Sequence, residues 1–225
     1  MILIRVLNFI GYRCINLAFD IDNVHHYPKE EYERYILEDP NGMLRVTYPL
    51  NKDSLVVDVG GLTGDWASRI YCLYSCNVDI YEPCLTLFNQ AQMNFERNQK
   101  VRVFGYGLSN KDDTMKLYGD SQNASLYKND RGNVTTVLIL QASKIFTKYN
   151  HIDLLKINVE GAEYDILPDL ISNYDMTKIT DIQIQFHKNV PDCDKKRDAI
   201  RRDLSKTHHM NWCYDYIFEN WTVNK

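Results

Sequence analysis

The chain has 225 residues, of which 44% are hydrophobic and 12% aromatic, so it can bury one sizeable core but is short for two. The formal net charge is −4, and no long run of Lys or Arg is present to neutralise phosphates, so we expect no nucleic-acid partner. The six cysteines form no C-x-x-C pair. Free thiols in a reducing, cytoplasmic compartment are the simplest interpretation.

The first 19 residues are apolar but contain Arg5 and Arg13. On a helical wheel the polar residues gather on one side, which predicts an amphipathic helix. We expect this helix to pack on its own domain, and a helix in peripheral contact with a membrane surface is the alternative. A membrane span or a cleaved signal is not expected, because Arg5 and Asn8 interrupt the apolar run.

Residues 1–50 are therefore interpreted as an N-terminal helical extension with an edge strand. A second helix is predicted over 28–39, opened by Pro28 and stopped before Pro40. After a turn at Asn41-Gly42, residues 43–50 (MLRVTYPL) are predicted to form the edge strand.

In residues 51–225, apolar β-branched runs alternate with helical patterns. Strands are predicted over 55–59, 78–81, 101–106, 151–159 and 180–186, helices over 65–74, 85–98, 162–172 and 192–206, and two closing strands or a hairpin over 211–223. This order predicts an α/β fold, a Rossmann-like doubly wound sheet that is mostly parallel with an antiparallel C-terminal edge. The polar segment 109–135 is predicted to be a loop or weak hairpin that acts as a lid.

A glycine-rich turn, DVGGLTGD at 58–65, joins the first of these strands to the first helix. Glycines there let the backbone approach a ligand closely, and the helix N-terminus offers free N–H groups. Glu82 ends the next strand, 22 residues after Gly60, where its carboxylate can accept both hydroxyls of a ribose. These features together predict a nucleotide or nucleoside cofactor site.

Asp58 discriminates between the cofactors that use such a turn. A carboxylate two residues before the first glycine would repel the pyrophosphate of a dinucleotide. The ammonium and sulfonium charges of S-adenosylmethionine would instead be attracted by Asp58 and Asp65. S-adenosylmethionine is therefore the predicted cofactor. A nicotinamide-dependent oxidoreductase is one alternative, and a purely turn-capping Asp58 is another.

These motifs resemble the FkbM family of S-adenosylmethionine-dependent methyltransferases. The matching segments are DVGGLTG at 58–64, Glu82-Pro83, LKINVEGAE at 155–163 and Gln185-Phe186-His187, within about residues 54–190. The resemblance implies a class I methyltransferase fold, a methyltransferase domain over 51–225, and O-methylation of a sugar or related hydroxyl on a small molecule or glycan. The cofactor-binding residues are then Asp58, Gly60, Gly61, Gly64, Asp65, Glu82, Leu108 and Ser109, with Gly107, Leu108 and Ser109 at the adenine.

The sequence shows three departures from the family pattern. Gly61-Leu62 stands where the family has Ala-Asn, Asn158 where it has Asp, and Gln185 where it has Glu. The loss of two carboxylates motivates a further alternative, a catalytically silent module that still binds the cofactor.

Methyl transfer from a sulfonium requires the protein mainly to align the acceptor and manage its proton. The candidate base is His187 at a strand end, and a structural histidine is the alternative. Asn158 and Glu160 are predicted to meet the methyl group and the acceptor. Three roles are open for Glu160: it holds the acceptor, it orients His187, or it caps the helix that begins at Ala162. Glu163 is interpreted as a charge in the first turn of that helix, where it complements the helix dipole. No metal is predicted, because no ligand spacing is diagnostic.

Overall fold

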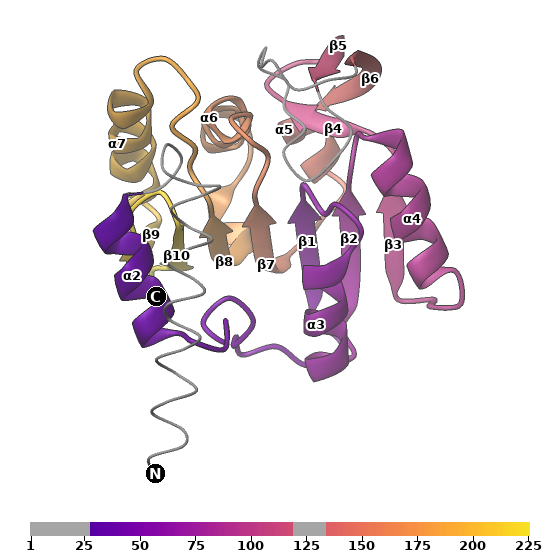
Figure 1. The fold of residues 1–225 in the computed structure, drawn as a ribbon, viewed down its shortest axis with the longest axis horizontal. Coiled ribbons are helices and arrows are strands. Elements are labelled where there is room, and N and C mark those ends of the chain that lie inside the picture. Colours follow the sequence, from indigo (N-terminus) through magenta and orange to yellow (C-terminus); the bar gives the residue numbers. More distant parts are fainter. Residues whose placement is uncertain (1–27, 119–133) are drawn as a thin grey trace.

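The computed structural model describes residues 28–118 and 134–225, which fold around a seven-stranded sheet (Figure 1). Its strands, in spatial order, are β3 (Val101–Phe104), β2 (Asn77–Tyr81), β1 (Leu55–Val59), β7 (Ile152–Ile157), β8 (Ile179–Ile184), β10 (Phe218–Val223) and β9 (His208–Tyr214). The pairs formed by β10 are antiparallel and the others are parallel. The predicted doubly wound sheet with an antiparallel C-terminal edge is confirmed.

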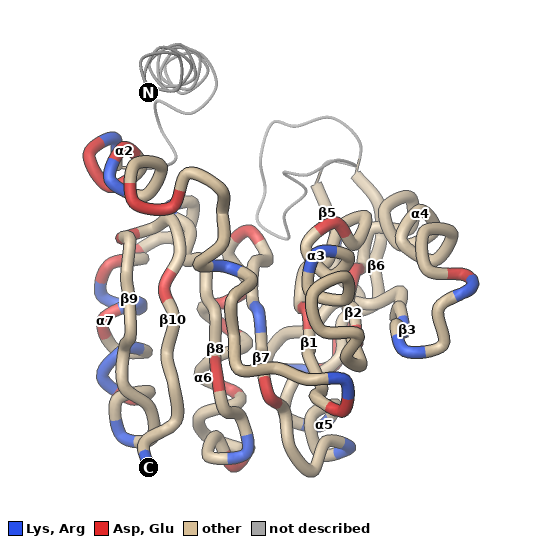
Figure 2. The backbone as a smooth tube through the Cα atoms, turned by 90° about the horizontal axis from the view of Figure 1, so that it is seen from below, with Lys and Arg blue, Asp and Glu red and all other residues tan. Residues whose placement is uncertain are grey.

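Helices cover both faces of this sheet (Figures 1 and 2). One face carries α2 (Lys29–Glu38), α3 (Asp65–Tyr74) and α4 (Leu85–Phe95), and the other carries α5 (Ala142–Phe146), α6 (Glu163–Asn173) and α7 (Cys193–Leu204). A short 3-10 helix, η1 (Met176–Lys178), precedes β8. Because side chains alternate along a strand, β1 places Val57 in the α6-side core and Val56 in the α3-side core.

The chain runs outward from β1 to β3, then returns across the sheet to β7. Strand order therefore reverses between β1 and β7, which are hydrogen-bonded neighbours with Val59 beside Ile157. In open α/β sheets, ligands bind at the carboxyl ends of the strands at such a switch point. Gly60, which follows β1, and Asn158, which follows β7, lie at that place.

A second, three-stranded sheet lies above the carboxyl ends of β1 and β2 (Figure 1). It consists of β4 (Gly107–Ser109), β6 (Val134–Gln141) and β5 (Asp113–Tyr118), in the order β4-β6-β5. Since β5 and β6 are antiparallel, the hairpin expected within 109–135 is present, although residues 119–133 lie outside the described ranges. Strand β6 extends to Gln141 and was not predicted.

The edge strand predicted over 43–50 is wrong. The chain forms turns there, and the N–H groups of Met43 and Leu44 donate to the Asp39 carboxylate at 2.7 and 3.0 Å. Val46 and Tyr48 are buried against α3, while Thr47 between them is exposed. This alternation of burial imitates the period of a strand without any ladder of hydrogen bonds.

The predicted helix over 28–39 is confirmed as α2, whereas the amphipathic helix of residues 1–19 lies outside the described residues. Among the described helices, none has the length and hydropathy needed to cross a membrane. The five cysteines in the described ranges are free thiols, as expected: Cys72, Cys76, Cys84, Cys193 and Cys213.

Candidate functional site

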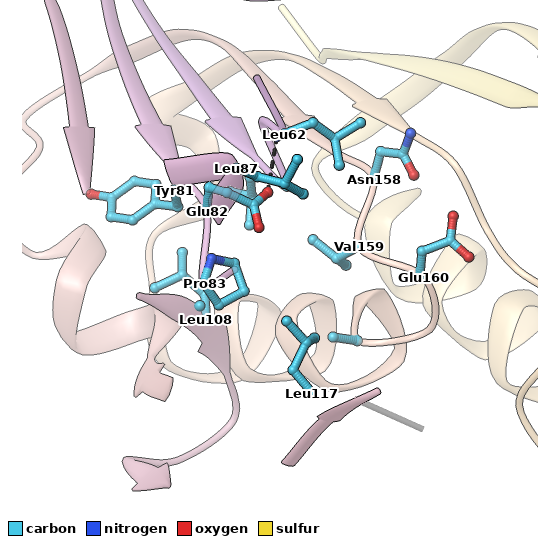
Figure 3. A pocket seen from close by; sticks show the side chains of 14 residues that line it. Leu62, Tyr81, Glu82, Pro83, Leu87, Leu108, Leu117, Asn158, Val159 and Glu160 are labelled. Carbon is cyan, nitrogen blue, oxygen red and sulfur yellow. Dashed lines mark hydrogen bonds between the residues drawn. The ribbon is translucent and has the colours of Figure 1, made fainter. Parts of the chain in front are cut away.

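A pocket lies between the carboxyl ends of β1, β2 and β7 and the three-stranded sheet (Figure 3). Its empty space, counted together with the open space at its mouth, is about 630 Å³. Its lining residues are Val59, Gly60, Leu62, Tyr81, Glu82, Pro83, Leu87, Gly107, Leu108, Leu117, Asn158, Val159, Glu160 and Ala162. The walls are thus mainly apolar, with polar side chains at separate points.

The glycines of the β1–α3 turn are required by close packing. Gly60 has φ +80°, and a Cβ there would lie 1.9 Å from the carbonyl oxygen of Asn158. Gly64 has φ +86°, and its Cβ would lie 2.4 Å from the Phe95 ring. These positions therefore exclude other residues on two grounds, backbone conformation and space.

Several N–H groups of the turn before α3 already have acceptors within the protein. Gly60 and Gly61 donate to the carbonyl of Tyr81 at 2.9 and 3.3 Å, and Gly64 donates to the carbonyl of Gly61 at 2.8 Å. A pyrophosphate needs such N–H groups. The N–H groups of Gly60, Gly61 and Gly64 are therefore not available to a phosphate.

Glu82, after β2, is one of two acidic side chains that line the pocket. Only 4% of the residue is exposed. One carboxylate oxygen accepts from Leu62 N at 2.9 Å and the other from Cys84 N at 2.9 Å. Burial raises the pKa of Glu82, and these two N–H groups oppose that rise. Each oxygen keeps a second lone pair, so the carboxylate can also accept two ribose hydroxyls.

Asp58 lies beneath the turn and does not line the pocket. It is fully buried, and its Oδ1 accepts from Lys156 Nζ at 2.8 Å. The same ammonium group donates to the carbonyl of Gly60 at 2.8 Å. Burial lowers the pKa of Lys156, and Asp58 opposes this. The direct cofactor contact predicted for Asp58 is thus replaced by support of the turn from β7.

The remaining predicted residues divide into two groups. Gly60, Glu82, Leu108, Asn158 and Glu160 line the pocket, whereas Gly61, Gly64, Asp65, Ser109 and His187 do not. Asp65 is exposed at the start of α3, so its predicted contact with the cofactor has no support from this arrangement.

Sequence reasoning missed most of the apolar wall, including Leu87 and Leu117, and had noted Leu62 only as a departure from the family pattern. Leu117 is an inward-facing residue of β5, and the alternation in DTMKLY at 113–118 was the available signal. Pro83 also belongs to this wall. It had been noted only as part of the Glu82-Pro83 motif.

His187 does not fit the predicted role of a general base. Its Nδ1 lies 3.0 Å from Glu163 Oε1, and its Nε2 lies 3.2 Å from Glu160 Oε1, an ion-pair contact outside hydrogen-bond geometry. Burial lowers the pKa of His187, but Glu163 and Glu160 outweigh it and raise the pKa to about 10. The imidazole is therefore protonated at neutral pH and has no lone pair to accept a proton.

This arrangement predicts a pH dependence of stability. The pKa of His187 is raised from 6.5 to about 10 on folding, so its contribution is fully present below pH 6.5 and is lost as pH rises through about 10. The urea midpoint of unfolding should be higher for the wild type than for His187→Gln. The difference between the two midpoints should be largest near pH 6 and should become smaller toward pH 10. A gap that stays constant over this range would contradict the assigned charge.

Comparisons with known proteins agree with the fold and with the family resemblance. The profile of the "Methyltransferase FkbM domain" matches residues 58–206. A "putative caffeoyl-CoA O-methyltransferase from Staphylococcus aureus" is 11% identical with a TM-score of 0.51, covering 96% of this chain and 100% of that chain, which shows a shared fold. No curated protein matches the chain.

Two further solved structures are more distant. M. capricolum TrmK, in complex with S-adenosylhomocysteine, is 14% identical with a TM-score of 0.44, covering 79% of this chain and 65% of that one. An rRNA methylase from Streptococcus thermophilus is 9% identical with a TM-score of 0.44, covering 78% and 90% of the two chains.

The doubly wound sheet with an antiparallel C-terminal edge matches the class I methyltransferase fold. The chain belongs to the FkbM methyltransferase family, and its cofactor is S-adenosylmethionine. The residues present fit this cofactor, since Glu82 retains acceptor capacity for a ribose and Leu62, Pro83 and Leu108 offer apolar surface for an adenine. The nicotinamide-dependent alternative is thereby set aside.

Proposed function

We propose that this protein transfers the methyl group of S-adenosylmethionine to a hydroxyl oxygen of a sugar or related acceptor. The observation that carries the proposal is the placement of Asn158 and Glu160 on the pocket wall across from Glu82 (Figure 3). In the proposal Glu82 binds the cofactor ribose, and the other two side chains face the acceptor. An amide and a carboxylate are suited to orient a neutral hydroxyl group.

Residues 51–225 form the methyltransferase domain in this proposal, consistent with the profile match over 58–206. When bound, the cofactor supplies an electrophilic methyl group and a thioether leaving group. Asn158 donates a hydrogen bond to the acceptor oxygen, and Glu160 accepts the hydrogen bond of its O–H. As the oxygen forms its new bond to carbon, the proton moves to the carboxylate of Glu160. The protein thus contributes alignment and a proton acceptor.

We propose a small-molecule or glycan acceptor in the cytoplasm. Acidic and basic residues are interspersed along the described chain, without a long basic stripe (Figure 2). A nucleic-acid substrate favours a clustered basic surface. This charge distribution therefore supports a hydroxyl acceptor that carries no phosphate backbone.

The test measures transfer from methyl-labelled S-adenosylmethionine to methyl glycosides, oligosaccharides, rRNA and protein. We expect label on a sugar oxygen, and Glu160→Gln should lower kcat about 100-fold while cofactor affinity is retained. The control is Asp192→Asn, since Asp192 shares the left-handed backbone of Glu160 (φ 55° against 53°) but does not line the pocket. Its kcat should be unchanged.

Label on RNA or protein would contradict the proposed acceptor. Asn158 lies in the pocket at a position where the family has Asp, which favours a second candidate, the catalytically silent cofactor-binding module. Tight binding of S-adenosylmethionine without transfer to any acceptor would support that candidate and refute the enzymatic proposal.

A further inference from the structure

Glu163 is completely buried in the first turn of α6. Its Oε2 accepts from Gly161 N at 2.8 Å, and its Oε1 accepts from His187 N at 2.8 Å and faces His187 Nδ1 at 3.0 Å. A first-turn charge that only complements a helix dipole can stay in solvent. A buried carboxylate instead requires such partners, so Glu163 joins the β7–α6 loop to the end of β8.

The His187 ring is clamped between two carboxylates, with Glu163 at Nδ1 and Glu160 at Nε2. Two carboxylates at the two nitrogens are both attracted only if both nitrogens carry protons. The other groups around it are Tyr164 of α6, whose hydroxyl donates to the His187 carbonyl at 2.9 Å, and Lys188, whose ammonium lies over the Tyr216 ring. His187 is therefore held as a cation with a fixed orientation.

Glu160 has a backbone conformation that needs such support. Its φ is +53°, in the left-handed region that is unfavourable for a residue with a Cβ, and Gly161 follows with φ +116°. Asn189 Nδ2 donates to the Glu160 carbonyl at 3.0 Å. Three contacts thus fix the loop. Asn189 binds the Glu160 carbonyl, Glu163 binds the N–H of Gly161, and His187 forms an ion pair with the Glu160 carboxylate.

We propose that Glu163 and His187 form a positioning pair that holds the carboxylate of Glu160 at the acceptor side of the pocket. The inference rests on the proposed function, because it assigns Glu160 to the acceptor hydroxyl. Neither member lines the pocket, so both act through Glu160. His187 restricts the orientation of its carboxylate, and Glu163 fixes the loop and the ring.

The first measurement is an NMR titration of His187 in the wild-type protein and in Glu163→Gln. The amide of glutamine can still accept from Gly161 N, but its NH₂ group would face the N–H groups of His187. We expect the pKa of His187 to fall by about 2 units or more in the variant. A wild-type His187 that titrates near its ordinary value would overturn the proposal, even if the variant fails to fold.

The second measurement compares kcat with the affinity for S-adenosylmethionine, using the acceptor found in the screen above. Glu163→Gln should lower kcat about 100-fold and leave the calorimetric Kd of the cofactor nearly unchanged. The double variant Glu163→Gln/His187→Gln should lose no more than the worse single variant, since the two residues act as one unit. Additive losses would contradict this.

The matched control is Asp169→Asn. Asp169 is another buried carboxylate on α6, and it accepts from Ser143 N and Gln141 Nε2 at 2.7 Å each, away from the pocket. The Asp169→Asn variant should be less stable than the wild type, but the pKa of His187 and the kcat per folded molecule should not change. If Glu163→Gln behaves in the same way, its role is structural only and the proposal fails.

If the wild type methylates no hydroxyl acceptor, the proposed function fails. The His187 titration still decides whether the pair exists.

Discussion

We expect Lys156→Met to lower the free energy of unfolding by about 4 kcal/mol, as is usual when one partner of a buried ion pair is removed. Lys156 and Asp58 are both buried, with Nζ and Oδ1 2.8 Å apart. Asp58 Oδ2 already has no hydrogen-bond partner among the described residues. The substitution would leave the whole carboxylate without its ion-pair partner, and the Gly60 carbonyl without its donor. Urea unfolding measures the loss.

Two controls separate the ion pair from the loss of side-chain packing. The double variant Lys156→Met/Asp58→Asn should recover most of the lost stability, because neither charge of the pair then remains. Lys206 makes an exposed ion pair with Asp203 at the same distance of 2.8 Å, so Lys206→Met should leave the urea midpoint unchanged. A single Lys156→Met variant as stable as the wild type would refute this account of the turn.

The second large effect is expected at Glu82. We expect Glu82→Ala to weaken S-adenosylmethionine binding about 1,000-fold, or about 4 kcal/mol, since two charge-assisted hydrogen bonds to the ribose are lost. The acceptors of the Leu62 and Cys84 N–H groups are also removed, so the turn that lines the pocket is loosened as well. Calorimetry with S-adenosylmethionine and S-adenosylhomocysteine measures both affinities.

Asp65→Ala is the matched control for this experiment. Asp65 is a carboxylate beside the same turn, but it is exposed and does not line the pocket. Its replacement should change cofactor affinity less than about threefold, the effect of a screened surface charge. If Asp65→Ala weakens binding as much as Glu82→Ala, the cofactor lies outside the pocket and over the start of α3.

The sequence by itself determined the sheet, the glycine turn and the acidic strand end. Local periodicity encodes these features. The strands β1, β2, β7 and β8 are short runs rich in apolar residues, and in the helices between them the apolar residues recur every three to four positions. The glycine turn and Glu82 could be located from the sequence because each directly follows a predicted strand. The same local signal failed at 43–50, where burial of Val46 and Tyr48 alternates without strand pairing.

The tertiary structure alone decided the roles of the charged residues. Asp58 meets Lys156 from a neighbouring strand, and Glu163 meets His187 at the end of β8. Each role depends on a partner far away in the chain, which no local pattern encodes, and on burial, which decides whether a charge is solvated or must be paired. For that reason Asp58 and His187, expected to touch the cofactor and the acceptor, lie behind the pocket wall and support it.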